Sequence, residues 1–326
     1  MIQILIMLVS IRILTTLLSP GEVGNYYLAI SILAFFNLVF LNPPGVYFSR
    51  HLLEWYRSKN LFNALVLFLL WILIVTLIAV PIVVILFEIS NYEQKFNYYM
   101  FIVFVLLSII ISTAHRNITY GLNTIGHRKE FVYVLTITLF FGLLFSTGLI
   151  YFFKPKSLLW LYGIIISETV IIYFAFKFFV KGNLLEIKKI KEVLNIERLK
   201  KILVFTFPIA ITTFLMWGQT ISYRFIIDYK YSAEVLGYMA IGLGVSSSIF
   251  GSLEAIVTQY FNPIFLKDIL DSTKEERAKA WNKMASIIVP IYLFTLVFVI
   301  SMSEKLIFIL ADNQFHDSYH YTMVGA

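Results

Sequence analysis

Two stretches of the chain resemble each other: RILTTLLSPGEVGNYYLAI at Arg12–Ile30 and RFIIDYKYSAEVLGYMAI at Arg224–Ile241. In each stretch an arginine inside an apolar run precedes a Glu-Val pair by ten residues, and a tyrosine then leads into Ala-Ile. Both copies have the pattern of one membrane helix ending, a short turn, and the next helix beginning. A repeat at a spacing of about two hundred residues is far longer than a solenoid period. It predicts a protein built from two similar membrane lobes, as many transporters are.

The composition is that of a membrane protein. Of the 326 residues, 60% are hydrophobic and only 14% are charged, whereas soluble domains are about one-quarter charged. The formal charge is +7, but lysine and arginine occur in short blocks between apolar runs, which indicates membrane topology and not nucleic-acid binding. The absence of cysteine excludes disulfides and thiolate metal sites. We therefore expect membrane lipids as partners, and neither nucleic acid nor a cofactor.

Nine segments have the length and apolar character of membrane-spanning helices, which need roughly 20 residues to cross the hydrocarbon layer. Transmembrane strands would be shorter and would alternate in polarity. The fold class predicted is an all-α polytopic bundle of about nine transmembrane helices. The segments are Met1–Leu18, Tyr26–Leu41, Leu61–Phe87, Tyr98–Thr113, Phe131–Phe153, Leu158–Val180, Ile202–Ile227, Val235–Phe261 and Ala285–Met302.

The distribution of basic residues predicts the orientation of these helices. Alternate loops hold most of the lysine and arginine, including Arg116 between the fourth and fifth segments. The other set of loops holds only Lys95, Lys154, Lys156, Lys230 and Lys305. By the positive-inside rule the basic loops and the amino terminus are cytoplasmic.

The chain divides into two predicted lobes joined by a basic segment. Residues 1–180 form a six-helix N-terminal lobe, and residues 202–326 form a partial C-terminal lobe of about three helices. Between them, the apolar side chains of residues 181–201 fall on one helical face, which predicts an amphipathic linker on the anionic inner leaflet. Because the second lobe is incomplete by comparison with the first, we expect helices to be missing from this chain.

No arrangement of residues indicates an enzyme. The chain has no phosphate-binding glycine-rich loop and no nucleophile elbow. His316 and His320 are spaced for a metal site on a helix, but no third ligand accompanies them. We predict neither catalysis nor a metal site.

Polar side chains inside apolar segments are the candidate site residues, because charge within a bilayer is costly and usually faces a cavity or a partner. The functional reading is a cationic cavity between the lobes for an anionic substrate. An alternative is that each arginine extends toward its nearby outer loop, and that Arg224 pairs locally with Asp228 four residues later. The candidates for lining the cavity are Arg12, Thr16, Trp217, Thr220 and Arg224.

Two carboxylates within the apolar segments are candidates for ion coupling. Glu168 lies near the middle of the sixth segment and Glu254 in the inner half of the eighth. Such a carboxylate suits a proton or sodium site, although a structural carboxylate hydrogen-bonded between helices is an equal alternative.

Several stretches carry a resemblance to a known family. ILTTLLSPGEVGNYYLAISI resembles the first helix-loop-helix of bacterial polysaccharide repeat-unit flippases of the O-antigen type. These belong to the superfamily that also holds the MATE multidrug exporters. RNITYGLNTIGHRKEF, Arg116–Phe131, looks like the family's loop between helices four and five, and VFTFPIAITTFLMWGQTISYRFII, Val204–Ile227, is similar to its seventh helix. Loose motifs of this kind cover most of the chain.

The resemblance implies alternating access between two lobes and translocation of a lipid-diphosphate-linked oligosaccharide across the bacterial inner membrane, for O-antigen, lipopolysaccharide or other polysaccharide synthesis. It also implies, as partners, a polysaccharide polymerase and chain-length machinery. Arg12 and Arg224 correspond by position to the family's arginines at the outer ends of helices one and seven. Three alternatives remain open: a MATE-like exporter of organic cations, a membrane enzyme, and a non-enzymatic scaffold of a glycan assembly complex.

Overall fold

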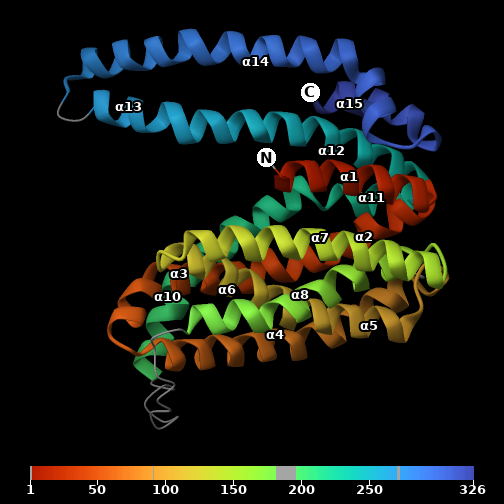
Figure 1. Cartoon of the computed structure of the whole chain (residues 1–326), viewed down its shortest axis with the longest axis horizontal. Helices are drawn as coiled ribbons and strands as arrows, with labels where there is room; N and C mark the ends of the chain where they lie inside the picture. The colour runs from red at the N-terminus through yellow and green to blue at the C-terminus, as the bar shows by residue number, and fades with distance from the viewer. Residues whose placement is uncertain (1, 91, 181–195, 270–271) are drawn as a thin grey trace. The chain divides into compact units, whose positions relative to one another are not determined.

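A computed structural model describes residues 2–90, 92–180, 196–269 and 272–326, and within these ranges the protein is helical without a strand (Figure 1). Eight of the described helical segments are long and apolar enough to cross a membrane, and α1 is a shorter apolar helix. The predicted all-α membrane bundle is confirmed.

The first part of the chain comprises α1 (Ile2–Leu17), α2 (Pro20–Phe36), η1 (Asn37–Leu41), α3 (Asn42–Arg57), α4 (Leu61–Ser90), η2 (Tyr92–Gln94), α5 (Tyr98–Leu107), η3 (Ser108–Ser112), α6 (Thr113–Thr124), α7 (Arg128–Phe152) and α8 (Ser157–Phe179). The second part comprises α10 (Ile196–Thr220), α11 (Tyr223–Lys230), α12 (Ala233–Ile256), η4 (Val257–Phe261), α13 (Asn262–Asp268), α14 (Lys274–Leu310), η5 (Asn313–Ser318) and α15 (Tyr319–Gly325).

Several spanning helices are longer than hydropathy predicted, among them Lys274–Leu310, which was predicted only over Ala285–Met302. Pro20–Arg57 and Tyr98–Thr124 are each continuous, because polar residues extend the helix beyond the apolar run. Of the predicted linker, residues 181–195 lie outside the described residues, and residues 196–201 form the first turns of α10.

The seventh predicted segment, Ile202–Ile227, is not a single helix. It is broken at Ile221 and Ser222, so that α10 ends at Thr220 and α11 begins at Tyr223. Across the break the amide of Arg224 bonds to the carbonyl of Ile221, 3.1 Å away, which is the three-residue spacing of a tight turn. The prediction of one helix over Ile202–Ile227 is therefore wrong, and the candidates Thr220 and Arg224 lie in different helices.

Short π-helical segments occur at corresponding places in the two parts of the chain. Segment η1 is followed at once by Asn42-Pro43, and η4 is followed by Asn262-Pro263. Proline lacks an amide hydrogen and its ring crowds the preceding turn, so a wider turn before it relieves the clash. A π-helical turn inside a longer helix is frequently found at a functional site.

The order of elements is the same in the two parts of the chain. A spanning helix, a π segment, a short helix, a long helix containing proline, a 3₁₀ turn and a further helix follow one another in both. The first succession is α2, η1, α3, α4, η2 and α5, and the second is α12, η4, α13, α14, η5 and α15. Pro81 and Pro290 occupy the long helices of the two successions. This is the order expected of two related lobes.

Contacts divide the chain into two compact units that do not follow the predicted lobe boundaries. Unit 1 comprises Met1–Ser10 and Asn25–Ser232, and unit 2 comprises Ile11–Gly24 and Ala233–Ala326. Unit 1 thus includes α10 and α11, whereas unit 2 includes the second half of α1. The division at 180 and 202 therefore stays a prediction about the repeat.

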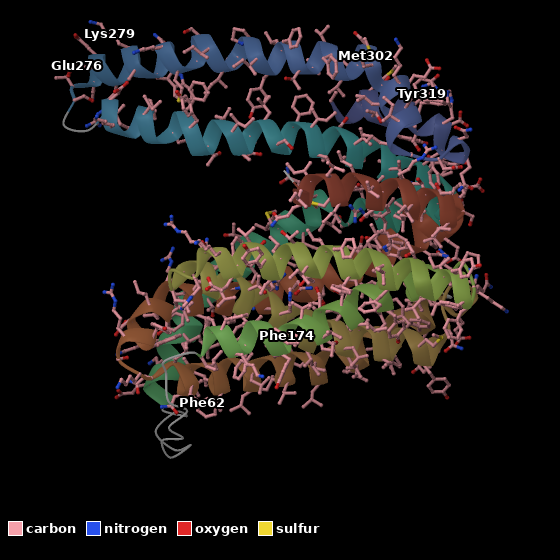
Figure 2. The ribbon with its side chains drawn as sticks, in the orientation of Figure 1. Phe62, Phe174, Glu276, Lys279, Met302 and Tyr319 are labelled. Atoms are coloured by element: carbon pink, nitrogen blue, oxygen red, sulfur yellow. The ribbon has the colours of Figure 1, made fainter. Side chains whose placement is uncertain are left out.

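Close helix packing builds unit 1, in which α7 and α8 lie side by side (Figure 1). The Ser146 hydroxyl donates to the Trp160 carbonyl at 2.6 Å, and a Cβ on Gly163 would lie 2.3 Å from the Ser146 amide nitrogen. Small residues at such a contact let two backbones approach, as is usual between membrane helices. The surface remains apolar, with Phe174 among the exposed side chains (Figure 2).

In unit 2 the two copies of the repeated sequence meet. A Cβ on Gly24 would lie 1.7 Å from the carbonyl oxygen of Ala233, and one on Gly237 would lie 2.1 Å from that of Pro20. The contacts are reciprocal, because Pro20 begins α2 as Ala233 begins α12. Glycine is required at both positions, since any larger side chain would collide with backbone.

The long helix α14 of unit 2 begins at a defined cap. The Thr273 hydroxyl accepts from the Glu276 amide at 3.4 Å, and the Glu276 carboxylate accepts from the Thr273 amide at 2.8 Å. This reciprocal capping box satisfies amides that a helix start leaves unpaired. Figure 2 shows charged Glu276 and Lys279 at this end of α14, and Met302 near its other end.

Candidate functional site

Arg224 and Trp217 are brought together by one residue of α2, Ser31. The Arg224 guanidinium donates through Nη1 to the Ser31 hydroxyl, and the Trp217 indole donates to the Ser31 carbonyl, both at 3.2 Å. The guanidinium carbon of Arg224 also lies 5.1 Å from the centre of the Tyr27 ring, within the range of a cation–π contact. Two of the predicted site residues therefore form a single cluster in unit 1.

The guanidinium of Arg224 retains hydrogen-bonding capacity. Its Nε is buried and has no hydrogen-bond partner among the described residues. An arginine presents five donors and prefers planar anionic partners such as carboxylate or phosphate. A partly satisfied guanidinium inside a spanning segment is suited to receive an anion.

Thr220 does not belong to this cluster. Its hydroxyl donates to the carbonyl of Met216 in its own helix at 2.7 Å, and its side chain is exposed. The helix break at Ile221 separates it from α11.

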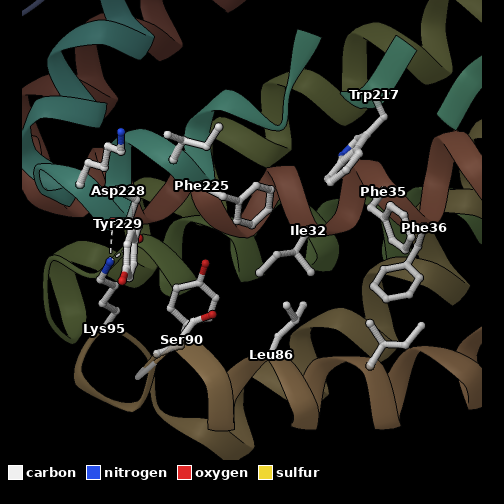
Figure 3. A pocket seen from close by; sticks show the side chains of 14 residues that line it. Ile32, Phe35, Phe36, Leu86, Ser90, Lys95, Trp217, Phe225, Asp228 and Tyr229 are labelled. Atoms are coloured by element: carbon white, nitrogen blue, oxygen red, sulfur yellow. Dashed lines mark hydrogen bonds and ion pairs between the residues drawn. The ribbon is translucent and has the colours of Figure 1, made fainter. Parts of the chain in front are cut away.

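A cavity of about 830 Å³ lies in unit 1 beside the Arg224 cluster (Figure 3). Helices α2, α4, α10 and α11 and the turn around η2 line it. Large apolar side chains, among them Phe35, Phe36 and Trp217, lie at one end, and polar side chains gather where α4 and α11 end. Its polarity therefore changes along its length.

Lys95 and Asp228 form an ion pair at the polar end of this cavity (Figure 3). The Asp228 side chain is 5% exposed and that of Lys95 is 25% exposed, and the ammonium contacts both carboxylate oxygens. The alternative of a local pair between Arg224 and Asp228 is not formed, because Lys95, in the turn between α4 and α5, pairs with Asp228 instead. The pair joins that turn to α11.

Tyr92, in the same turn, lies close to the ion pair. Burial raises the pKa of the Tyr92 phenol to about 12, and the negative charge of Asp228 adds to the shift. The hydroxyl is therefore protonated at neutral pH and is available as a donor.

Glu168 takes part in a polar network that crosses unit 1. The Ser112 hydroxyl of η3 donates to the Glu168 carboxylate of α8, and the Arg116 guanidinium of α6 interacts electrostatically with it. Arg116 also donates to the side-chain oxygen of Asn37 in η1 at 3.0 Å. The network includes a residue from each of the two π-helical segments of this unit, so that Glu168 is positioned by hydrogen bonds between helices.

Glu254, the other carboxylate candidate, is placed differently. Its side chain is exposed on α12 and forms no hydrogen bond or ion pair with another described residue. The structure does not bring it together with Glu168, which belongs to unit 1, whereas α12 belongs to unit 2.

Arg12 and Thr16 contact the end of α14 in unit 2. The Arg12 guanidinium donates to the Phe308 carbonyl at 3.0 Å, in the last turn of α14. A cation there satisfies an unpaired carbonyl and interacts favourably with the helix dipole. The Thr16 hydroxyl donates to the Arg12 carbonyl at 2.8 Å and lies 3.5 Å from an Asp312 carboxylate oxygen. A cationic cavity shared by Arg12 and Arg224 stays a prediction, because the two residues belong to different units.

The sequence did not predict the side chains with which Glu168 and Asp228 interact. The sequence predicts that Arg116 lies in a cytoplasmic loop, but the residue lies within a spanning helix. It places Lys95 in an outer loop and predicts no role for it, but Lys95 forms an ion pair. The run His115-Arg116-Asn117, directly after an apolar segment and without glycine or proline, is a local signal that the helix continues. No local pattern links Lys95 to Asp228, which lies 133 residues later. Among the described residues, no three histidine, cysteine, aspartate or glutamate side chains are grouped as a metal site.

Comparison with known proteins extends the assignment of the fold. No protein-family model matches the chain, and no curated protein matches it in sequence. Among solved structures, the chain is similar to one described as an inward-facing conformation of a multidrug resistance MATE family transporter of the MOP superfamily. The TM-score is 0.68 at 14% identity, and the match covers 99% of this chain and 77% of that one. The protein is thus a multi-pass membrane bundle whose fold is that of a MATE-like transporter.

Proposed function

We propose that the protein is a secondary transporter that moves a lipid-diphosphate-linked oligosaccharide across the bacterial cytoplasmic membrane, with its amino terminus in the cytoplasm. The fold supports transport in general, and the chemistry of the intramembrane side chains supports an anionic substrate. The proposal includes no catalytic step. A polysaccharide polymerase and chain-length machinery would be the partners that use the translocated product.

The observation that carries the choice of substrate is the Arg224 cluster. A guanidinium within the spanning segment Leu199–Lys230 is held by Ser31 and Tyr27 and keeps a buried Nε without a partner. Leaving a buried polar group unpaired costs about 1–3 kcal/mol. A bound diphosphate would recover that energy, because Arg–phosphate hydrogen bonds are charge-assisted.

Export of a small organic cation is the second candidate. The similar solved structure is described as that of a multidrug resistance transporter, and Glu168 provides a carboxylate inside the helices of unit 1. On this candidate Glu168, and not Arg224, would be the residue that recognises the substrate.

Binding measurements separate the two candidates. We expect the detergent-solubilised full chain to bind a short-chain isoprenyl diphosphate sugar, and Arg224→Ala to weaken that binding at least tenfold, because a charge-assisted contact is worth about 1.5–3 kcal/mol. Lys154→Ala, at an exposed turn position, is the matched control. Binding of a cationic dye that is lost in Glu168→Gln but kept in Arg224→Ala would support the exporter and contradict the flippase.

A further inference from the structure

The cavity lined by α2, α4 and α11 is apolar at one end and polar at the other, so it is complementary to an amphiphilic ligand. Its volume of about 830 Å³ falls within the roughly 300–1,000 Å³ of pockets that bind organic ligands. Figure 3 shows Phe35, Phe36 and Trp217 toward one end, Leu86 between the ends, and Lys95, Asp228 and Tyr229 at the other end. An apolar chain matches the first end, and a charged headgroup matches the second.

The polar end carries an uncompensated positive charge. Lys95 is neutralised by Asp228. Lys230, which also lines the cavity, forms no hydrogen bond or ion pair with another described residue. Ser90 and Tyr92 add hydroxyl groups to the same end, and the Ser90 side chain hydrogen-bonds that of Tyr92. The Lys230 ammonium together with the Tyr92 hydroxyl donor is complementary to a single phosphate group.

The cavity lies within the spanning helices, which indicates that its ligand comes from the surrounding bilayer. Its apolar lining belongs to α2, α4, α10 and α11, and its polar lining belongs to the ends of α4 and α11 and to the turn around η2. The division between chain and headgroup in a bilayer follows the same order, with lysine and tyrosine at the headgroup level.

We propose that this cavity binds a phosphate-bearing membrane lipid, with the lipid chain against Ile32, Leu86 and Trp217 and the phosphate at Lys230. The proposal goes beyond the transport function, because it requires only that the lipid resides in the cavity. It assigns Lys230 a binding role that is independent of the Arg224 cluster.

The test titrates phosphatidate, diacylglycerol with the same chains, and inorganic phosphate into the delipidated full chain, with native mass spectrometry as the readout. Phosphatidate is expected to bind most tightly. Lys230→Gln is expected to weaken its binding about fivefold, as for loss of one lysine near an anionic headgroup. Lys154→Gln, which removes an exposed charge outside the cavity, is expected to leave binding unchanged.

A second measurement locates the lipid chain. Phosphatidate with brominated chains is expected to quench tryptophan fluorescence, and the quenching is expected to fall when Trp217 is replaced by phenylalanine. The proposal is overturned if diacylglycerol binds as tightly as phosphatidate, if millimolar inorganic phosphate displaces the lipid, or if Lys154→Gln and Lys230→Gln lose equal affinity. Quenching that is the same with and without Trp217 would likewise overturn it.

Discussion

Substituting Gly24 with alanine tests the contact between the two copies of the repeat. The added Cβ would lie 1.7 Å from the Ala233 carbonyl oxygen, whereas a carbon–oxygen contact needs about 3.3 Å. The starts of α2 and α12 must therefore move apart by about 1.6 Å, because backbone cannot rotate away as a side chain can. Overpacking of this kind costs about 1–3 kcal/mol, which outweighs the gain of roughly 1 kcal/mol in helix propensity.

The thermal unfolding midpoint of the detergent-solubilised protein measures the effect. The net cost, after the gain in helix propensity is subtracted, is up to about 2 kcal/mol, so at roughly 2 °C per kcal/mol Gly24→Ala is expected to lower Tm by up to about 4 °C. Gly21→Ala is the matched control in the same helix, since its Cβ would meet no atom within 4 Å, and it is expected to leave Tm unchanged or raise it.

The reciprocal contact at Gly237 predicts the Tm of two further variants. Gly237→Ala is expected to lower Tm as well, because its Cβ would lie 2.1 Å from the Pro20 carbonyl oxygen. The double variant should lose less than the sum of the single losses, since one separation of the helices relieves both collisions. If Gly24→Ala is as stable as Gly21→Ala, the two copies are not packed as the structure shows.

Three other outcomes follow from the structure. Asp228→Asn leaves the Lys95 ammonium without its partner and is expected to lower the free energy of unfolding by about 1–3 kcal/mol, or by less because Lys95 is partly exposed. A double variant that exchanges the two charges should recover part of the lost Tm, and no recovery would contradict a direct pairing. Because the pKa of the Tyr92 phenol is raised to about 12, its protonated form contributes stability that is fully present below pH 10 and is lost as the pH rises toward 12. An ultraviolet difference titration should show a lower pKa for this phenol in Asp228→Asn, and an unchanged pKa would rule out the contribution of Asp228. Arg12→Gln is expected to lower the free energy of unfolding by about 0.3–1 kcal/mol and to speed amide hydrogen exchange around Phe308 in the last turn of α14, and Arg12→Lys is expected to have a smaller effect. If neither variant changes the exchange rate, Arg12 does not cap α14.

Hydropathy was sufficient to predict the spanning helices because unpaired backbone groups are so costly in hydrocarbon that apolar runs must be helical. It placed the ends of those helices poorly where polar residues extend them. Tyr98–Thr124 continues through Arg116 because hydrogen bonds inside unit 1, such as the one from Arg116 to Asn37, satisfy its polar groups. Composition alone does not reveal such internal partners.

The candidate site was predictable in part. Arg224 is a candidate because a charge inside an apolar segment is costly, and Trp217 is a candidate because it lies in the same segment; both side chains contact Ser31. The break before Arg224 was not predicted, because Ile221-Ser222 contains no residue that ends a helix. The partner of Asp228 was not predictable, since sequence spacing suggests neighbours along one helix, such as Arg224, and not a lysine on a distant turn.

Translocation in reconstituted vesicles tests the proposed function most directly. The 326-residue chain would be reconstituted with a fluorescent short-chain isoprenyl diphosphate sugar, and arrival of the headgroup at the opposite face would be followed by a membrane-impermeant quencher. We predict protein-dependent translocation that Arg224→Ala abolishes and Lys154→Ala preserves. Translocation that proceeds at the same rate with Arg224→Ala, or that requires no protein, would contradict recognition of an anionic headgroup by the Arg224 cluster.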